Sequence, residues 1–240
     1  MATELTDQSL SAQRSARGRA VGCVTGTGIG HAVAVSSAPA ERNGTGPPPR
    51  GGGRDAITAA ARESFAERGY HGTSIRDIAR RAGLSLSALY YWHPSKQHLL
   101  AALIEESTHD YFQRCDDALR GTGDDPVDRL DALVRVTVEY RVARQVESNI
   151  STLEWRNLEP ENRERLEGLR RSATRLWADI IADGVARGAF HIQHPDDARR
   201  AIVAACNAIA QWYEPGGDIT LPQLAERYAA IALRIVDHRA

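Results

Sequence analysis

The sequence predicts an all-α fold of about nine helices. From residue 54 onward, apolar side chains recur at the three- and four-residue spacing of helices that bury one face. Helix starts are marked by N-cap residues and by prolines that suit a first helical turn, and no turn dipeptide lies between alternating β-branched residues. With 240 residues, 42% of them hydrophobic, the chain is long enough to bury a core without disulfides or metals.

The chain divides into three predicted parts. Residues 1–53 are rich in Gly, Ala, Ser, Thr and Pro and have no helical or strand period, so we expect a disordered arm. Residues 54–100 predict a small three-helix domain, and residues 101–240 predict a larger helical domain. Glycines interrupt the uncharged run over residues 20–40, and no segment is apolar enough for a membrane helix. We therefore expect a cytoplasmic protein with no membrane partner.

The small domain contains three predicted helices. The first runs from Arg54 to a stop at Gly69, with one apolar face formed by Ile57, Ala60, Ala61 and Phe65. A second begins at the N-cap Ser74, with Asp77 as its capping-box partner, and ends at Gly83. A third, very short helix begins at Ser85 and ends before Pro94, with Leu89 pointing inward. Two short helices joined by a tight turn are typical of a helix-turn-helix, whose second helix lies in the DNA major groove.

Longer helices are predicted for the rest of the chain. One starts at Ser95 and continues to about Leu119. Pro126, Pro160 and Pro195 each begin a pattern of about 20 to 28 residues. Thr220 and Gln223 form a capping box that begins a final helix to Asp237.

Charge and motif content narrow the function classes. Residues 54–104 carry a net charge of +3 and residues 105–240 a net charge of −6, which favours an anionic partner for the small domain alone. The three cysteines are far apart, which argues against a disulfide framework or a zinc site. The histidines and carboxylates form no known catalytic motif, and the sequence has no phosphate-binding loop. We therefore expect that the protein is not an enzyme and has no catalytic residue, no metal and no cofactor.

Three runs in the small domain resemble the TetR family of bacterial repressors. They are AERGYHGTSIRDIA at residues 66–79, AGLS at residues 82–85 and LYYWHPSK at residues 89–96. The all-helical body extends the resemblance to the end of the chain. His93 departs from the family pattern, in which an aromatic residue, usually Phe, precedes the proline. The resemblance implies a homodimer on double-stranded operator DNA, with DNA contacts from Thr73, Arg76, Tyr90, Tyr91 and Lys96.

The residue types of the small domain suit two kinds of DNA contact. Ser74, Ser85, Tyr90 and Lys96 can donate to phosphates, which would set the position of the domain on the duplex. Arg76, Ser87, Ala88 and Tyr91 are then left to contact base edges and thymine methyl groups. Trp92 and His93 fit either a DNA contact or the domain core. Arg42, Arg50 and Arg54 fit either a minor-groove arm or an inert extension.

The larger domain is expected to join two copies and to hold a small molecule. Small apolar faces on the last two helices suit close packing against a second copy or an intramolecular core: Ala201, Ala204, Ala205, Ala208, Ala229, Ala230 and Leu233. Polar and aromatic residues that interrupt apolar helices are the candidate ligand contacts: Tyr140, Arg144, Trp155, Arg156, Trp177, Asn207 and Gln211, with Trp212 beside them.

Residues 177–228 are similar to TetR-family repressors of steroid and fatty-acid breakdown that respond to acyl-CoA thioesters. This resemblance implies an acyl-CoA effector, with phosphates bound by one of Arg144, Arg156, Arg170 and Arg171. The main hypothesis is a repressor that its ligand releases from DNA, with coupling through the helix from Ser95 to Leu119. The alternative is an activator or architectural dimer that needs no ligand, whose body would be filled solidly with side chains.

Overall fold

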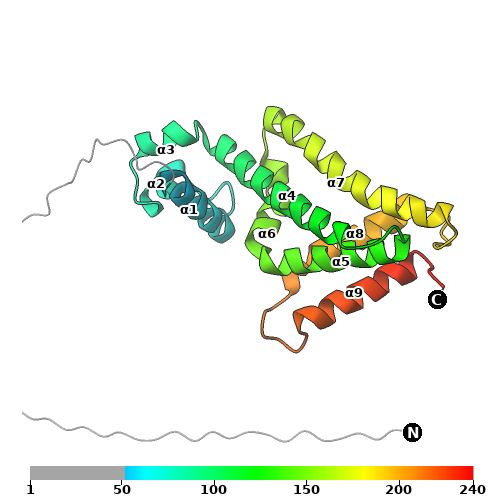
Figure 1. Ribbon diagram of the computed structural model, residues 1–240. Coiled ribbons are helices and arrows are strands. Elements are labelled where there is room, and N and C mark those ends of the chain that lie inside the picture. Colours follow the sequence, from blue (N-terminus) through cyan, green and yellow to red (C-terminus); the bar gives the residue numbers. More distant parts are fainter. Residues whose placement is uncertain (1–51, 240) are drawn as a thin grey trace, which may run out of the picture. The chain divides into compact units, whose positions relative to one another are not determined.

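The computed structural model describes residues 52–239, and most of that range is helical (Figure 1). Within it there are nine α-helices, one short 3₁₀-helix and no strand, so the predicted fold class and helix count are confirmed. The predicted arm over residues 1–53 lies almost entirely outside the described residues. The helices are α1 (Gly52–Arg68), α2 (Ile75–Arg81), α3 (Leu86–Trp92), α4 (Lys96–Arg120), α5 (Pro126–Ala143), α6 (Gln145–Leu153), the 3₁₀-helix η1 (Trp155–Asn157), α7 (Pro160–Ala186), α8 (Pro195–Trp212) and α9 (Leu221–Ile235).

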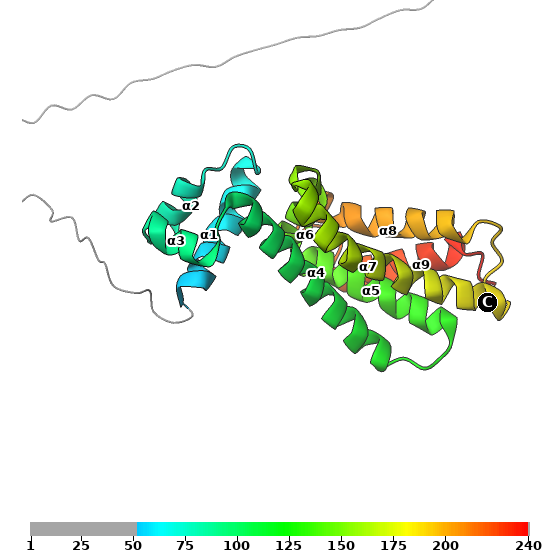
Figure 2. The ribbon, with the colours of Figure 1, turned by 90° about the horizontal axis from the view of Figure 1, so that it is seen from above.

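The helices α1, α2 and α3 form a small unit, here called the head, around the start of α4 (Figure 2). Gly69 ends α1 and Gly83 turns the chain between α2 and α3, both with the positive φ that glycine adopts without strain. The hydroxyl oxygens of Ser74 and Ser85 accept hydrogen bonds of 3.1 Å from backbone N–H groups in the first turns of α2 and α3. Leu89 is fully buried, as its position predicts.

The helix α4 belongs to both predicted domains. Its first half, from Leu99 to Ile104, packs in one apolar cluster with the head, whereas Tyr111 and Cys115 pack in a second cluster with α5 and α7–α9. The predicted boundary between residues 100 and 101 therefore falls inside a continuous helix. Because the head cluster also includes Ile150 and Leu158, the head is packed against the α6–η1 region as well.

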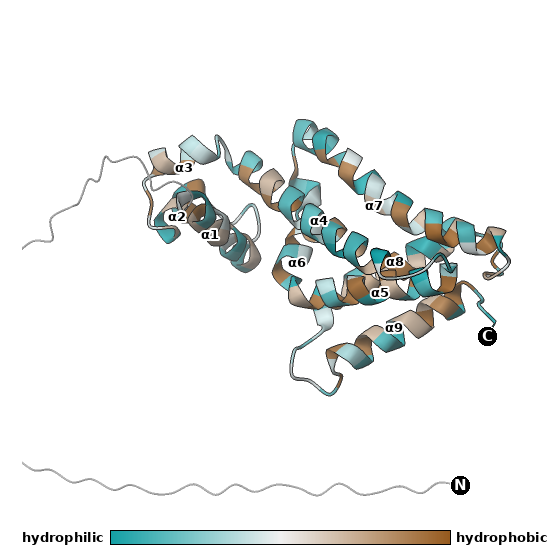
Figure 3. Ribbon diagram, viewed as in Figure 1, coloured by the Kyte–Doolittle hydropathy of each residue, from teal (hydrophilic) through white to brown (hydrophobic). Residues whose placement is uncertain are grey.

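The helices α5 to α9 form the rest of the structure, here called the body. In the body α5 packs against α4, α7, α8 and most extensively against α9. Figure 3 shows hydrophobic stretches along α5, α8 and α9, in keeping with this central position of α5. Gly184 in α7 allows the ring of Phe190 to lie against the helix, in space that a Cβ atom would occupy. No helix in the described part of the chain is long and apolar enough to cross a membrane.

Two helices of the body are shorter than the sequence-based expectation. The helix that begins at Pro126 ends after 18 residues at Ala143, and a separate helix, α6, follows. Arg144 has a non-helical backbone (φ −121, ψ 45), and its side chain forms an ion pair with Asp110 of α4. The helix from Pro195 is also shorter than expected, at 18 residues. A first-turn proline marks where a helix begins but carries no information about its end.

Candidate functional site

Most of the head residues singled out from the sequence lie on an exposed surface formed by α2 and α3. Tyr91 is 75% exposed and Tyr90 is 44% exposed, which is unusual for aromatic side chains in a small domain. Ser85 and Ser87 are exposed beside them, while Ala88 is half-buried. On α2 and its N-cap, Arg76 and Ser74 are also exposed. The head therefore presents seven of the nine predicted DNA-binding residues, Ser74, Arg76, Ser85, Ser87, Ala88, Tyr90 and Tyr91, at or near its surface.

The other two predicted DNA-binding residues hold the head together instead. Thr73 is only 2% exposed, and its hydroxyl is within 2.9 Å of the carbonyl oxygens of Ser64 and Gly69. The structure therefore places the Thr73 side chain inside the head, and its contact with DNA stays a prediction. Lys96 is half-buried and donates to the carbonyl oxygens of Tyr70 and Thr73 at 2.8 and 2.9 Å. Its ammonium also lies 4.0 Å from the centre of the Tyr70 ring, so Lys96 ties the start of α4 to the turn between α1 and α2, and its contact with a phosphate stays a prediction.

The structure also decides the open question about Trp92 and His93. His93 is 4% exposed and Trp92 is half-buried against the head cluster, so both belong to the interior. His93 Nε2 has no hydrogen-bond partner among the described residues. Burial lowers the pKa of the imidazole, and the nearby charges of Arg54 and His98 lower it further.

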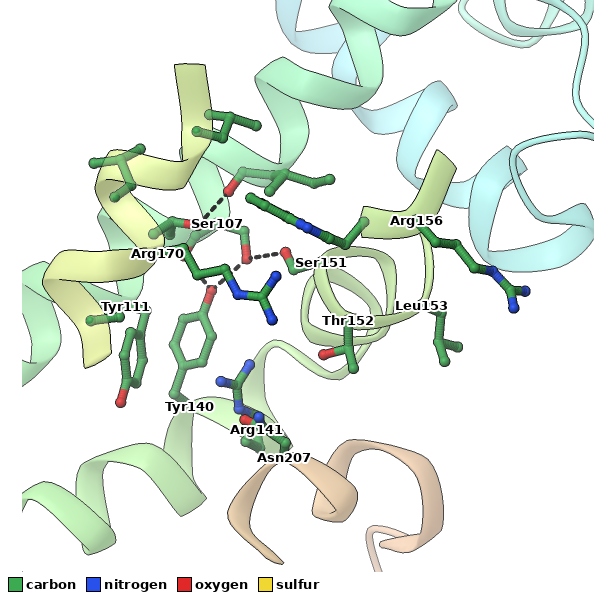
Figure 4. A pocket seen from close by; sticks show the side chains of 16 residues that line it. Ser107, Tyr111, Tyr140, Arg141, Ser151, Thr152, Leu153, Arg156, Arg170 and Asn207 are labelled. Carbon is green, nitrogen blue, oxygen red and sulfur yellow. Dashed lines mark hydrogen bonds between the residues drawn. The ribbon is translucent and has the colours of Figure 1, made fainter. Parts of the chain in front are cut away.

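A cavity of about 420 Å³ lies in the body (Figure 4). Its walls come from α4, α5, α6, η1, α7 and α8. They are formed by Ile104, Ser107, Thr108, Tyr111, Tyr140, Arg141, Ser151, Thr152, Leu153, Trp155, Arg156, Leu166, Leu169, Arg170, Ala173 and Asn207. A second cavity of about 350 Å³ shares Tyr111, Arg141, Arg170, Ala173 and Asn207 with the first, so the two are adjoining spaces. A concave, largely apolar space with a few converging polar groups is typical of a small-molecule site.

Four of the seven ligand candidates predicted from the sequence line the first cavity: Tyr140, Trp155, Arg156 and Asn207. Trp177 lines only the second cavity, where its indole N–H donates to Tyr111 Oη at 3.2 Å. Arg144 and Gln211 line neither cavity. Arg144 is held on the outside by Asp110 at 3.0 Å, and Gln211 lies on the exposed side of α8. Of the four arginines left open as phosphate ligands, Arg156 and Arg170 line the first cavity.

Two buried tyrosines stiffen the walls shared by α4 and α5. The hydroxyl of Tyr140 donates to the carbonyl oxygen of Ser107 at 2.6 Å. The hydroxyl of Tyr111 is 3.0 Å from Thr137 Oγ1. Burial raises the pKa of both phenols, so both stay neutral in the physiological range. Because these hydroxyls already have hydrogen-bond partners inside the protein, they hold the shape of the cavity and need no hydrogen bond from a ligand.

Three arginines give the first cavity a positive potential. Arg141, Arg156 and Arg170 line it, and none has a carboxylate oxygen within 4.0 Å among the described residues. Arg141 stands over the rings of Tyr111 and Tyr140 at 5.4 and 5.6 Å, and Arg170 lies 4.9 Å from the Trp155 ring. Sequence reasoning missed Arg141, although its place directly after Tyr140 in a helix could have suggested it. Unpaired guanidinium groups around a cavity favour an anionic ligand.

One wall of the cavity is hydrogen-bonded to the head. The α6–η1 segment, residues 145–157, contributes Ser151, Leu153 and Trp155 to the cavity. Glu154, in the same segment, accepts a hydrogen bond of 3.2 Å from the backbone N–H of Tyr70 in the head. Asn157 Oδ1 lies 3.0 Å from His71 Nε2.

The side chains of Gln97 and Arg62 add further contacts between the head and the α6–η1 segment. The Gln97 side-chain amide donates to Tyr70 Oη at 2.8 Å and to the carbonyl oxygen of Asn157 at 2.7 Å. Arg62 of α1 forms an ion pair with Glu147 of α6, with 3.2 Å between Nε and Oε1. The α6–η1 segment is thus joined by side-chain hydrogen bonds to the turn between α1 and α2.

Exposed apolar side chains also lie on α8 and on α9. Ala201, Ala205, Ala208 and Trp212 are spaced along one side of α8 and are exposed or half-buried, Trp212 at 46%. On α9, Ala230 and Ile231 are exposed, Ile231 at 45%. Ala229 is buried in the body, so this alanine serves the core and not an outer face. We call the exposed residues of these two helices the α8–α9 face.

Comparison with known proteins gives the same two-part division as the structure. Residues 57–103 match the family model described as bacterial regulatory proteins, tetR family, and residues 123–236 match the tetracyclin repressor-like C-terminal domain. The chain is 28% identical over 182 residues to the HTH-type transcriptional repressor KstR2 of Mycolicibacterium smegmatis, covering 75% of this chain and 88% of that protein.

Solved structures share the fold over most of the described chain. A bacterial regulatory protein of the tetR family from Rhodococcus RHA1 matches with a TM-score of 0.73 and 28% identity, covering 78% of this chain and 98% of the other. AibR in complex with isovaleryl coenzyme A and operator DNA matches with a TM-score of 0.68, covering 75% and 97% of the two chains. Its identity of 22% carries the likeness of fold alone. With both family models matched in order over the head and the body, the chain belongs to the TetR family of transcriptional regulators.

Proposed function

We propose that this protein is a homodimeric repressor that binds operator DNA through α3 and is released by an acyl-CoA thioester. The observation that carries the ligand-responsive part is the cavity, which is lined by three arginines without an ion pair to any described residue and has one wall hydrogen-bonded to the head. The body is not filled solidly with side chains, which argues against the ligand-independent activator or architectural dimer. KstR2, similar to this chain over most of its length, is itself a transcriptional repressor.

The exposed surface of the head supports the DNA-binding part of the proposal. Tyr91, Ser87 and Ala88 on α3, together with Arg76 on α2, would contact base edges and thymine methyl groups. Ser74, Ser85 and Tyr90 would donate to phosphates. Helix-turn-helix proteins read two half-sites with two heads, and one head here carries few positive charges. A dimer joined through the α8–α9 face would supply the second head.

The chemistry of the cavity supports an acyl-CoA effector. Ile104, Leu166 and Leu169 give an apolar lining that suits an acyl chain. Arg156 and Arg170 are placed on the same cavity, and guanidinium groups bind phosphates strongly. Such an intracellular metabolite would meet a regulator of operator DNA in the cytoplasm, which we propose as the compartment.

Two structural elements can carry the effect of the ligand to the head. The helix α4 lines the cavity with Ile104, Ser107 and Tyr111 and begins in the head, as the sequence-based hypothesis requires. The α6–η1 segment adds a second connection through Glu154 and Asn157. A ligand that pushes on either element would alter the separation of the two heads and so weaken DNA binding.

A mobility-shift titration tests the proposal. The purified full-length protein is titrated onto DNA from upstream of its own gene, with and without acyl-CoA thioesters of increasing chain length. We expect a shifted band at nanomolar protein that disappears at micromolar concentrations of at least one acyl-CoA, but not with free CoA. Binding that no acyl-CoA changes would refute the effector, and failure to bind that DNA more tightly than an unrelated fragment would refute autoregulation.

A further inference from the structure

Two buried polar atoms in the shared part of the two cavities have no hydrogen-bond partner. They are Arg141 Nε and Asn207 Oδ1, and neither has a hydrogen-bond partner among the described residues. Both residues line both cavities, and Figure 4 shows them at the same end of the first cavity. Leaving a buried donor or acceptor unpaired costs about 1–3 kcal/mol, so each of these atoms calls for a partner, and a ligand in the adjoining cavity would supply one.

The neighbouring residues hold Arg141 in place without neutralising it. Its guanidinium stands over the rings of Tyr111 and Tyr140, whose own hydroxyls are bound to Thr137, Trp177 and Ser107. No carboxylate pairs with Arg141 among the described residues. A guanidinium held over two rings is restricted in orientation, and the Nε–H of Arg141 has no acceptor among the described residues.

A ligand that binds both atoms must offer a hydrogen-bond acceptor to one and a hydrogen-bond donor to the other. Arg141 Nε carries a proton and needs an acceptor, whereas Asn207 Oδ1 needs a donor. Carboxylates, phosphates, ketones and thioester carbonyls only accept at neutral pH, so they satisfy Arg141 alone. A secondary amide offers a carbonyl oxygen and an N–H on one rigid planar group. The pantetheine arm of coenzyme A contains secondary amides close to the thioester.

We propose that Arg141 and Asn207 together bind a secondary amide of the effector, with the carbonyl on Arg141 Nε and the N–H on Asn207 Oδ1. This inference rests on the proposed function, because it names the part of an acyl-CoA that the body recognises besides its phosphates. Arg141 would bind the amide carbonyl, whereas Arg156 and Arg170 would bind the phosphates. Recognition of the amide distinguishes a CoA thioester from the free fatty acid with the same chain.

Neutral thioester probes separate amide recognition from phosphate recognition. The amide probe is the S-acyl derivative of N-acetylcysteamine, and the ester probe replaces its N–H by oxygen. Both carry the same acyl chain, hexanoyl in one pair and decanoyl in the other, and neither carries a phosphate. Calorimetric titration of the full-length protein without DNA should give about tenfold tighter binding of the amide probe, the value of one hydrogen bond to a buried polar group.

Three variants give the inference its controls. Asn207→Leu should abolish the preference for the amide probe, and Asn207→Asp, which keeps an acceptor oxygen, should retain it. Arg141→Met should weaken both probes by a similar factor, because both keep the carbonyl. Thermal melting of each variant shows whether it is folded, and the retained preference of Asn207→Asp is a result that a merely structural role would not produce.

The outcomes separate this inference from the proposed function. Equal binding of amide and ester probes to the wild-type protein would overturn the amide site, as would binding of neither probe up to millimolar concentration. Either result leaves the release of operator DNA by hexanoyl-CoA or decanoyl-CoA to be judged by the mobility-shift titration. Conversely, an amide preference without any release of DNA would keep the site and overturn the effector response.

Discussion

The backbone N–H of Tyr70, in the turn after α1, donates a hydrogen bond of 3.2 Å to Glu154 Oε1, between α6 and η1. Residues on both sides of Glu154 line the cavity of the body, namely Leu153 and Trp155. Glu154, which binds the head, is therefore a direct sequence neighbour of two residues that line the cavity. The same carboxylate also accepts from the Asn157 side-chain amide, and Asn157 lies against His71 of the head.

Replacement of Glu154 tests this connection. In Glu154→Ala the Tyr70 N–H and the Asn157 amide lose their common acceptor, so a displacement of η1 should reach the head less effectively. We expect the ratio of operator dissociation constants with and without acyl-CoA to fall by about fivefold or more, within the usual range of allosteric coupling. Fluorescence anisotropy of labelled operator measures both constants for each protein.

Glu161→Ala is the matched control for this experiment. Glu161 lies in the first turn of α7, is exposed and forms no ion pair among the described residues. It should leave the ratio unchanged. A wild-type ratio in Glu154→Ala would mean that the ligand acts through α4 alone.

Tyr91 is the residue whose loss should affect DNA binding with least effect on folding. Its side chain is 75% exposed, so Tyr91→Ala should leave the melting temperature within about a degree of the wild-type value, as for surface substitutions in general. We expect about a tenfold or greater loss of operator affinity, because each good base contact contributes about 1–3 kcal/mol. Tyr91→Phe separates the ring from the hydroxyl. Undiminished affinity in Tyr91→Ala would exclude Tyr91 from the DNA interface.

If two copies join through the α8–α9 face, a charge placed on this face should disrupt the dimer. Ile231 is 45% exposed on α9, near the exposed Ala230. A carboxylate in Ile231→Glu would have to be desolvated in a dimer but not in a monomer. We expect sedimentation velocity to show a monomer at micromolar protein and operator affinity to fall steeply. Ala186→Glu, at the exposed end of α7, should sediment like the wild type. A dimeric Ile231→Glu protein would place the interface elsewhere.

The head was more predictable than the body, for a physical reason. Its helices are delimited by strong local signals, such as the positive φ of Gly69 and Gly83 and the N-cap hydroxyls of Ser74 and Ser85. These signals act within four residues and can be read from the sequence. The hydrogen bonds of Lys96 and Thr73 could not be predicted, because their partners, the carbonyl oxygens of Tyr70, Ser64 and Gly69, depend on how the turn folds.

The cavity depends on contacts that no local pattern carries. Arg141, Arg170 and Asn207 come from three helices that meet only when α5, α7 and α8 pack. Tyr140 and Asn207 were found because polar residues in apolar helices are conspicuous. Arg144 was equally conspicuous but is drawn outward by Asp110, 34 residues earlier in the chain. The break between α5 and α6 that turns the chain towards the head was not visible either.

The buried imidazole of His93 predicts a pH-dependent stability. Burial and the charges of Arg54 and His98 hold its pKa below the ordinary value of about 6.5. In the unfolded chain the imidazole takes up a proton as the pH falls through about 6.5, whereas in the folded head it stays neutral to lower pH. The unfolded state then binds more protons, so the free energy of unfolding decreases as the pH falls, by at most about 1.4 kcal/mol per pH unit for this one group.

Replacement of His93 by the family's usual residue should remove this contribution. His93→Phe also eliminates a buried Nε2 without a partner, so it should raise the melting temperature at pH 8 and raise it further at pH 5. Differential scanning calorimetry at both pH values measures the two differences. The control is His109→Gln on the exposed side of α4, which should show little change in the difference between the two pH values. A constant difference between His93→Phe and the wild type from pH 8 to pH 5 would mean that the imidazole gains its proton as readily in the folded head as in the unfolded chain.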